Sequence, residues 1–242
     1  MSVFQQDPDI PAAISALYEE TQVPPSSAYR SIVPLADLMG SYNLTCTEIR
    51  DLKGHRALDY LSRRGGMVDF PDMADDEQLA GFIYVTSAFG AVFVEQGDLL
   101  VRRRFSVAHE LGHYLLHFRP LLTGKGPNDE PYLLEAMEAF PLSDLEAEPE
   151  DLPVGHIRFT GAHAADGRVM TSVQMEREAN LFASQLLMPT AVIQDLAARY
   201  APTIRGEDLV WRLATEMLVS RSAMRWRLRG LDLLTSPLAR WD

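Results

Sequence analysis

The sequence predicts an α+β fold that is mostly helical, with a small antiparallel sheet and a helical C-terminal region. Three features predict it: an apolar stretch rich in β-branched and aromatic residues, two long helical patterns downstream of it, and further helical patterns after residue 200. The chain has 242 residues, of which 47% are hydrophobic and 23% charged, so it can form a sizeable core. Its formal charge of −12 argues against a broad affinity for nucleic-acid phosphates.

The first elements follow from apolar spacing and from proline and glycine stops. Helices are predicted over residues 10–20, 34–39 and 55–63. The uncharged stretch 79–94 is too short to span a membrane. It divides into strands over 81–85 and 91–96, and the small residues between these strands suit a hairpin turn.

The remaining elements surround an acidic segment. A long helix over 104–118 is predicted to close at Pro120, and helices are predicted over 172–188, 190–200 and 206–234. Nine acidic residues and several prolines lie within 125–153. We interpret this segment as a surface insertion, a solvated acidic loop with one short helix near 132–139. The alternative is a flap that shields an electropositive site or mimics an acidic partner.

An HExxH motif, His109-Glu110-Leu111-Gly112-His113, lies inside the long helix. Spacing of four residues puts both imidazoles on one face, where two nitrogens can reach a single zinc ion. Glu110 then lies beside the attacking water, so its carboxylate can accept a proton and later return it to the leaving amine. The motif therefore predicts His109 and His113 as metal ligands and Glu110 as the catalytic base.

His117 extends the row of histidines by another turn. Three histidines at this spacing span about 12 Å along a straight helix, which is too far for one ion. We therefore expect His117 to pack or to hydrogen-bond a ligand. The third ligand must come from elsewhere in the chain.

The predicted helix over 172–188 is the best source of a third ligand. Glu176, Ala179, Asn180 and Ala183 share one face, and the two alanines would let this helix lie close to the HExxH helix. We favour Glu176 as the ligand and Asn180 as the hydrogen-bond partner of a ligating histidine. Glu178, rotated by roughly 200° from Glu176, is the alternative.

Two runs, RFSVAHELGHYLLH and EREANLFASQLLMP, resemble the ImmA/IrrE family of bacterial and phage metallopeptidases. Both family motifs match almost position for position. The resemblance implies a zincin-like zinc metallopeptidase domain, which we place over residues 1–200, with one Zn²⁺ per chain held by His109, His113 and Glu176. It also implies that the substrate is a helix-turn-helix repressor, which is cut so that its genes are released.

The substrate of zinc peptidases of this general plan lies extended along an edge strand. The segment 91–96, just upstream of the catalytic helix, is the natural candidate for this edge. A donor for the developing oxyanion is also needed, and the candidates are His156, His163 and several tyrosines. The substrate-binding residues themselves stay unassigned.

Residues 201–242 are predicted to form a helical region similar to a helix-turn-helix, with a tight turn near Val219-Ser220. Its second helix carries four arginines: Arg221, Arg225, Arg227 and Arg229. The apolar residues between them and the overall negative charge favour packing or repressor docking over DNA contact.

Cys46 is the chain's single cysteine, so an internal disulfide is excluded and a reducing compartment is expected. The first residues lack the pattern of a secretory signal, which again predicts a cytoplasmic protein. An ordinary small core residue is the favoured interpretation of Cys46. The alternative is a switch in which its thiolate occupies the fourth position on zinc.

The sequence thus predicts a cytoplasmic zinc endopeptidase that cleaves a partner protein, without a membrane segment. One alternative is a transcription regulator or protein-interaction module with a non-catalytic metal site. Structural zinc sites are normally closed by four protein ligands, and the sequence offers three, which favours catalysis. Another alternative is a general peptidase of short peptides. The same ligands could also accept manganese or iron.

Overall fold

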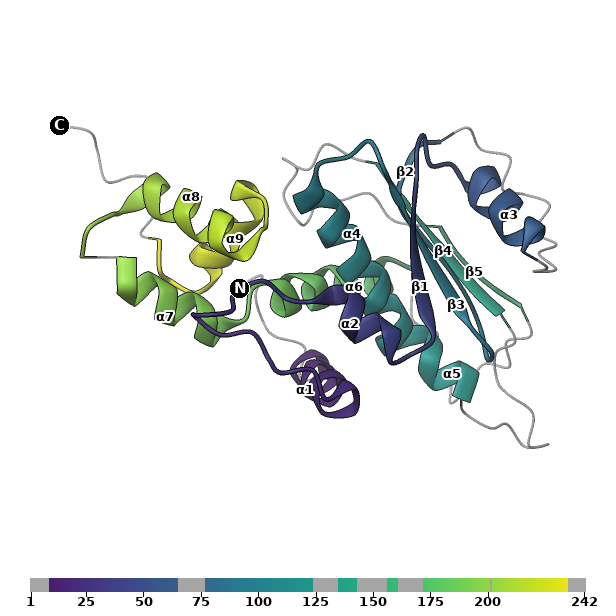
Figure 1. Cartoon of the computed structure of the whole chain (residues 1–242), viewed down its shortest axis with the longest axis horizontal. Coiled ribbons are helices and arrows are strands. Elements are labelled where there is room, and N and C mark those ends of the chain that lie inside the picture. The colour runs from purple at the N-terminus through teal and green to yellow at the C-terminus, as the bar shows by residue number, and fades with distance from the viewer. Residues whose placement is uncertain are drawn as a thin grey trace.

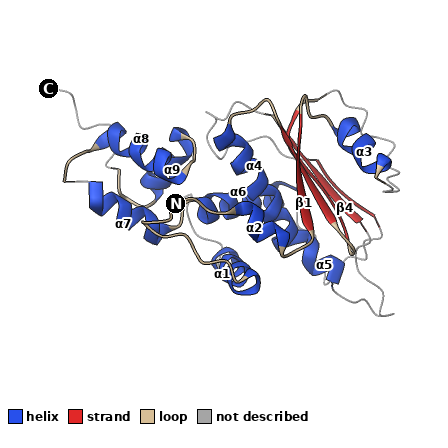
Figure 2. Cartoon of the chain, in the orientation of Figure 1, coloured by secondary structure: helices blue, strands red, loops and turns tan. Residues whose placement is uncertain are grey.

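A computed structural model of the chain describes residues 9–64, 77–123, 135–142, 156–160, 172–200 and 202–234. Helices dominate this part of the chain, and one five-stranded sheet lies at one end of the molecule (Figures 1 and 2). The predicted α+β class with a helical majority is confirmed. The elements in chain order are α1 (Asp9–Thr21), α2 (Leu35–Gly40), β1 (Leu44–Ile49), α3 (Gly54–Arg63), β2 (Leu79–Thr86), β3 (Gly90–Glu95), α4 (Leu100–His113), the π-helical η1 (Tyr114–Phe118), α5 (Arg119–Thr123), β4 (Glu135–Pro141), β5 (His156–Thr160), α6 (Ser172–Leu187), α7 (Thr190–Tyr200), α8 (Gly206–Met217) and α9 (Arg221–Gly230).

The sheet has the strand order β1-β3-β2-β4-β5. Strands β2 and β3 form the predicted antiparallel hairpin, with Ile83 opposite Val92. Strand β1 pairs with β3 in parallel, so the sheet is mixed and not purely antiparallel as predicted. The chain passes through α3 and β2 between these two strands, and such a crossover permits parallel pairing.

The expectation that segment 91–96 forms an edge strand is wrong. Strand β3 has β1 on one side and β2 on the other, so both of its edges are already hydrogen-bonded. Within the described residues the sheet ends at β1 and at β5. Buried and exposed residues do not alternate along β1, because Leu44 is buried and both Thr45 and Cys46 are exposed. Its sequence pattern therefore does not predict a strand.

The acidic segment also differs from its prediction. Residues 135–141 form strand β4, which pairs with β2 and β5, so the short helix near 132–139 is wrong and this part is no solvated loop. Residues 136–141 are all buried. These residues pair within a sheet that is covered on both faces. Burial of their apolar side chains there outweighs the tendency of the surrounding acidic residues towards a solvated loop. The rest of the segment 125–153 falls outside the described residues.

Apolar side chains of the strands alternate between two cores. Ile83, Val85 and Ala136 face the larger core with α4 and α6, whereas Phe82 and Met137 face the smaller core beneath α3. Figure 1 shows α3 on one side of the sheet and α4 and α6 on the other. Strands β2, β3 and β4 are therefore buried on both faces, and the face towards the larger core lies against the HExxH helix.

Helices α4 and α6 pack closely at a glycine. A Cβ atom on Gly112 would lie 3.2 Å from the Cα atom of Ala179 and 3.0 Å from Cδ1 of Phe182. Ala179 and Ala183 are both fully buried. The small residues on the two helices thus bring the backbones together, as the sequence predicted, and place the two motif-bearing faces side by side.

Helix α4 begins at Leu100 and continues through η1 and α5 to Thr123, past the predicted stop at Pro120. Pro120 lies in the first turn of α5, where its missing N–H costs little. The π-helical turn over 114–118 changes the direction in which the side chains after His113 point. This turn positions His117.

The C-terminal helices α7, α8 and α9 gather at the end of the molecule away from the sheet (Figure 1). Leu218 adopts a left-handed conformation after α8, and the hydroxyl of Ser220 accepts a hydrogen bond from the N–H of Ala223 at 3.1 Å to start α9. The tight turn near Val219-Ser220 is therefore present. The domain boundary at residue 200 stays a prediction.

Two of the four arginines predicted on the second helix contact other parts of the chain. The buried Arg227 donates hydrogen bonds to the carbonyl of Met188 and to the hydroxyl of Thr190. Arg225 forms an exposed ion pair with Glu207. The burial of Arg227 anchors α9 to the junction of α6 and α7 and removes this side chain from any nucleic-acid surface.

Within the described ranges, no single helix has the length and apolar content needed to cross a membrane. The helical segments Val173–Leu187 and Thr190–Tyr200 meet that test only as a pair, bent by 46°. Most of their apolar residues, among them Phe182 and Ile193, are buried in the protein core, whereas Val173 is exposed.

Glu95 holds the turn after β1 against β3. Its carboxylate accepts hydrogen bonds from the N–H groups of Leu52 at 2.6 Å, Gly97 at 2.6 Å and Asp51 at 3.2 Å, and from the amide of Gln78. Burial raises the pKa of Glu95, but these donors outweigh burial, so its pKa lies below the ordinary value. The ionised form therefore stabilises the fold.

We expect Glu95→Gln to lower the free energy of unfolding by about 2 kcal/mol at pH 7, because an amide offers fewer acceptor sites to these donors. A carboxyl group with a lowered pKa stabilises the fold above its unfolded-state pKa and loses this contribution as the pH falls through its folded-state pKa. The difference between wild type and variant should therefore shrink in urea titrations below about pH 4. A constant difference down to pH 3 would contradict this role.

Candidate active site

Four buried side chains come together between the sheet and the helices α4 and α6: His109, His113, Glu138 and Glu176. They could hold a metal ion, and we call these four the metal-binding group. Each offers one ligand atom, and these four atoms lie within 4.8 Å of one another. The two histidines and Glu138 are fully buried, and Glu176 is 4% exposed. The structure therefore brings together the three ligands that the sequence predicted and adds a carboxylate from β4.

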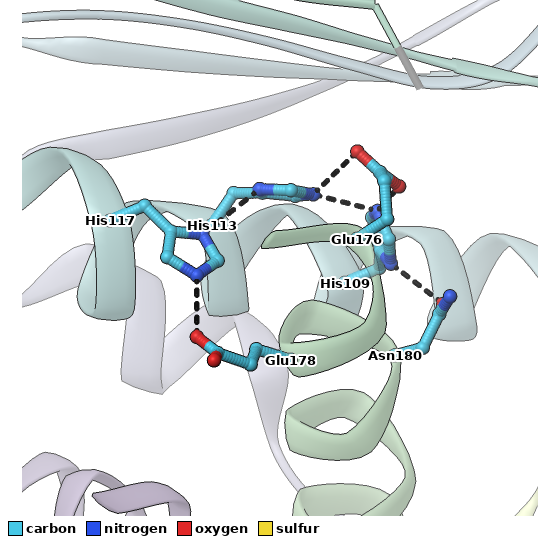
Figure 3. Close-up of polar contacts among 6 residues, drawn as sticks. All are labelled: His109, His113, His117, Glu176, Glu178 and Asn180. Carbon is cyan, nitrogen blue, oxygen red and sulfur yellow. Dashed lines mark hydrogen bonds and ion pairs between the residues drawn. The ribbon is translucent and has the colours of Figure 1, made fainter. Parts of the chain in front are cut away.

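The histidines and Glu176 form the tightest part of the group (Figure 3). The two Nε2 atoms of His109 and His113 lie 3.0 Å apart. The Glu176 carboxylate oxygens lie 3.4 Å from Nε2 of His109 and 3.3 Å from Nε2 of His113. Atoms bound tetrahedrally to one zinc ion at about 2.0 to 2.1 Å are about 3.3 Å apart, so this spacing fits a single ion.

His113 and Glu176 also suit a bound cation. Burial lowers the pKa of His113 to about 3, so its imidazole is neutral and keeps the lone pair that metal binding requires. Neither Glu176 oxygen has a hydrogen-bond donor. A buried carboxylate with no donor is costly, and a bound cation would offset that cost.

Asn180 orients His109. The side-chain oxygen of Asn180 lies 2.9 Å from Nδ1 of His109. Because an amide oxygen only accepts, the proton of this imidazole lies on Nδ1, and the lone pair of Nε2 faces Glu176. The geometry is the one that the sequence predicted for Asn180, one turn after Glu176 on α6.

His117 and Glu178 orient His113 in the same way, through one more hydrogen bond. Nδ1 of His113 lies 3.2 Å from Nδ1 of His117, whose Nε2 lies 3.2 Å from Oε2 of Glu178 (Figure 3). A carboxylate only accepts, so Nε2 of His117 carries a proton and its Nδ1 accepts from Nδ1–H of His113. The Nε2 lone pair of His113 then faces Glu176. Glu178 thus contacts His117, whereas Glu176 contacts both motif histidines.

Glu110 lies beneath β2. A Cβ atom on Gly81 would overlap Oε1 of Glu110 and would lie 3.4 Å from Cβ of Ser106, so only a glycine leaves room for this carboxylate. Burial raises the pKa of Glu110, although the neighbouring His109 opposes the shift. A carboxylate whose pKa approaches neutrality is suited to accept a proton and return it at working pH.

Two residues of β4 at the site, Glu138 and Phe140, were not predicted from the sequence. The Phe140 ring stacks on the His109 imidazole with their centroids 4.2 Å apart. Burial raises the pKa of Glu138 well above its ordinary value, and the charges of Glu110 and Glu176 raise it further. The signal in the sequence was the alternation of Ala136, Glu138 and Phe140, which puts all three on one face of a strand.

The described structure also locates the other candidates. Cys46 is exposed on β1 and is not in the metal-binding group, so its interpretation as a core residue is wrong and the thiolate switch has no support here. His156 belongs to β5, and its side chain is outside the description. His163 lies outside the described residues, so the oxyanion donor stays unassigned.

A family model described as the IrrE N-terminal-like domain matches residues 155–229. This part of the chain is similar to the ImmA/IrrE family. The match contains Glu176, Asn180 and the helices α6 to α8, which agrees with the resemblance of the segment EREANLFASQLLMP. It covers about a third of the chain, and the HExxH motif lies upstream of it. No significant match was found among curated proteins.

The ImmA/IrrE match supports a peptidase domain of the metal-dependent kind, and the buried group of histidines and carboxylates could hold its metal ion. The matched region continues across residue 200 into α9. The helices α7 to α9 therefore belong to the same matched segment as the Glu176 helix.

Loss of His117 is expected to weaken metal binding. His117→Leu removes the acceptor of the His113 Nδ1 proton, and loss of such a partner typically costs about 10- to 100-fold in metal affinity. His117→Gln, whose amide can both accept and donate, should restore most of the affinity. Competition with a fluorescent zinc chelator measures both. Equal affinities in wild type and His117→Leu would refute the orienting role.

Proposed function

We propose that the chain is an intracellular zinc-dependent endopeptidase that cleaves a partner protein, a helix-turn-helix transcriptional repressor. The observation that carries the proposal is the buried set of His109, His113 and Glu176 with Glu110 beside it. Two nitrogen donors, one oxygen donor and an adjacent carboxylate form the minimal machinery for hydrolysis of a peptide bond.

The metal would be held by His109, His113 and Glu176. Zinc, when bound, lowers the pKa of a water molecule and polarises a carbonyl group. We prefer zinc because imidazole and carboxylate donors spaced at 3.0 to 3.4 Å suit a small tetrahedral ion. Manganese and iron can bind the same donor types, and metal analysis distinguishes them.

Other residues of the chain transfer the proton and orient the ligands. Glu110 accepts a proton from the attacking water and donates it to the nitrogen of the departing amine. Gly81 leaves the room in which its carboxylate lies, and burial raises its pKa towards the range in which both transfers proceed. Asn180 and His117 hold the imidazoles of His109 and His113 with their Nε2 atoms towards Glu176.

A second candidate function has one observation in its favour. Glu138 raises the number of carboxylate and imidazole side chains in the group to four, the number that closes a structural zinc site. The chain would then be a transcription regulator or protein-interaction module with a non-catalytic metal. The ligand atoms of His109, His113 and Glu176 fit one ion more closely than the 4.8 Å limit for the whole group, so we favour catalysis.

Two observations support the repressor substrate: the similarity of residues 155–229 to the ImmA/IrrE family and the contacts of the C-terminal helices. Arg227 is buried against Met188, and Arg225 is paired with Glu207, so two of the four arginines that would read DNA are already engaged. We therefore favour contact with a protein over contact with DNA. We further propose that the reaction takes place in the cytoplasm, because a chain with Cys46 as its single cysteine suits a reducing compartment.

The test is incubation of the purified zinc-loaded chain with helix-turn-helix repressors from the same organism, followed by mass spectrometry of the products. We expect one repressor to be cut at a defined bond, cleavage to stop with 1,10-phenanthroline, and zinc to restore it. Unfolded casein and short peptides are the controls, because comparable turnover of these would indicate a general peptidase. Absence of cleavage of every substrate, with zinc bound, would favour the non-catalytic alternative.

A further inference from the structure

The candidate site is closed to solvent in the described conformation. Glu110, His109 and His113 are 0% exposed, and Glu176 is only 4% exposed. A peptide bond must come within hydrogen-bond distance of Glu110 to be hydrolysed. Part of the protein must therefore move before a substrate can bind, and the structure indicates which part.

Strand β4 covers the site from the side of the sheet. It contributes Glu138 to the metal-binding group and stacks Phe140 on His109. The ligands His109, His113 and Glu176 come from α4 and α6, which lie on the opposite side. Side chains of β4 thus fill the space that a substrate chain would need between the ligands and the sheet.

Strand β4 also lies where an added substrate strand would pair with β2. Strand β2 passes directly over the proposed base, since Gly81 lies against Glu110. Strand β4 pairs antiparallel with β2 from Thr86 to Leu79, on the side of β2 away from β3. Without β4 this side of β2 would be a free edge, and a free edge binds an extended peptide through main-chain hydrogen bonds.

We propose that β4 occupies the substrate's strand position on β2, so that the described conformation is a closed form and cleavage requires β4 to separate from β2. The proposal rests on the proposed function for its meaning, because it deepens the account of how a protein substrate reaches Glu110. The substrate class that fits this position is an extended segment that pairs antiparallel with β2.

Two features favour the separation of β4 from β2. Its pairing with β2 has an irregular register between Leu79 and Gly81, next to the proposed base. Its central side chain, Glu138, is a fully buried carboxyl group without a donor from the backbone or a basic residue. An acid at this position opposes burial of the strand, whereas an apolar residue there would favour it.

A reversible disulfide between β2 and β4 tests the proposal. Val85 and Ala136 are direct partners in the antiparallel register, where Cα atoms lie about 4.5 to 5.5 Å apart, within the range of a disulfide. The double variant Val85→Cys/Ala136→Cys is made in a Cys46→Ser background. The control pair, Ile83→Cys/Val92→Cys, links β2 to β3 in the same way and leaves β4 free.

The first readout is the rate at which 1,10-phenanthroline removes zinc, compared between the oxidised and reduced forms of each variant. We expect oxidation of the β2–β4 pair to slow removal at least tenfold and to abolish cleavage, and reduction to restore both. Oxidation of the β2–β3 pair should change neither. Equal removal rates in the oxidised and reduced β2–β4 variant would overturn the proposal.

A second variant acts in the opposite direction. Met137 lies on β4 but faces the smaller core beneath α3, away from the metal-binding group. Met137→Ala should weaken the packing of β4 against the smaller core without changing a ligand. Zinc removal should then become several-fold faster, in protein whose circular dichroism spectrum matches that of wild type. An unchanged rate would count against separation of β4. Because both readouts follow the metal, they test the proposal even if no substrate is cleaved.

Discussion

Glu110→Gln is expected to lower the rate of repressor cleavage by about 10²- to 10⁴-fold, the usual contribution of a general acid–base group. Glutamine has nearly the same shape, so it should fit beneath Gly81 as Glu110 does. The amide cannot accept the proton of the attacking water. The substitution does not alter His109, His113 or Glu176, so the variant should bind zinc as wild type does.

Cleavage is measured as single turnovers with the repressor, and metal content is measured on the same preparations. A matched control is Glu19→Gln, the same exchange at an exposed glutamate of α1 outside the metal-binding group, which should cleave at close to the wild-type rate. Loss of zinc from Glu110→Gln in proportion to the loss of rate would show that Glu110 holds the metal and is not the base.

Zinc is expected to stabilise the folded chain strongly. An ion bound at 100 times its dissociation constant adds about 2.7 kcal/mol, which corresponds to about 5 to 11 °C in unfolding temperature for a chain of this size. The physical reason is Glu176, a buried carboxylate whose two oxygens have no hydrogen-bond donor. A cation bound to it removes a cost that the metal-free fold bears.

The shift is measured by differential scanning calorimetry with and without zinc, after dialysis against a chelator. Magnesium serves as the control, because it prefers oxygen donors in an octahedral arrangement and should give almost no shift. An equal shift with magnesium, or the same zinc shift in Glu176→Ala, would contradict a specific site at His109, His113 and Glu176.

The sequence predicted that His109, His113 and Glu176 lie together, because their alignment depends on local spacing. His109 and His113 are one turn apart on a helix, and Glu176 and Asn180 are one turn apart on another, so helical periodicity alone aligns each pair. The close contact of the two helices followed from small residues, and Gly112 against Ala179 shows why. The ImmA/IrrE match agrees with the family resemblance.

Beyond the β2–β3 hairpin, the sequence did not predict the sheet around this group, because strand order depends on long-range pairing. From the sequence alone, β3 is predicted to be an edge strand, because β1 has no alternating apolar pattern and is not predicted as a strand. In the structure β1 pairs with the other side of β3. Strand β4 lies in an acidic segment, so composition suggested a solvated loop. Its place beside β2, and with it the position of Glu138, depends on pairing across more than 50 residues of sequence.

The most direct test of the metal site is elemental mass spectrometry of dialysed wild type, Glu176→Ala and Arg177→Ala. Arg177 is exposed on the same helix, next to Glu176, and is the matched control. We expect about one zinc per chain in wild type and in Arg177→Ala, and a loss of most of the metal in Glu176→Ala. Wild type without bound metal, or Glu176→Ala with a full complement, would contradict the account.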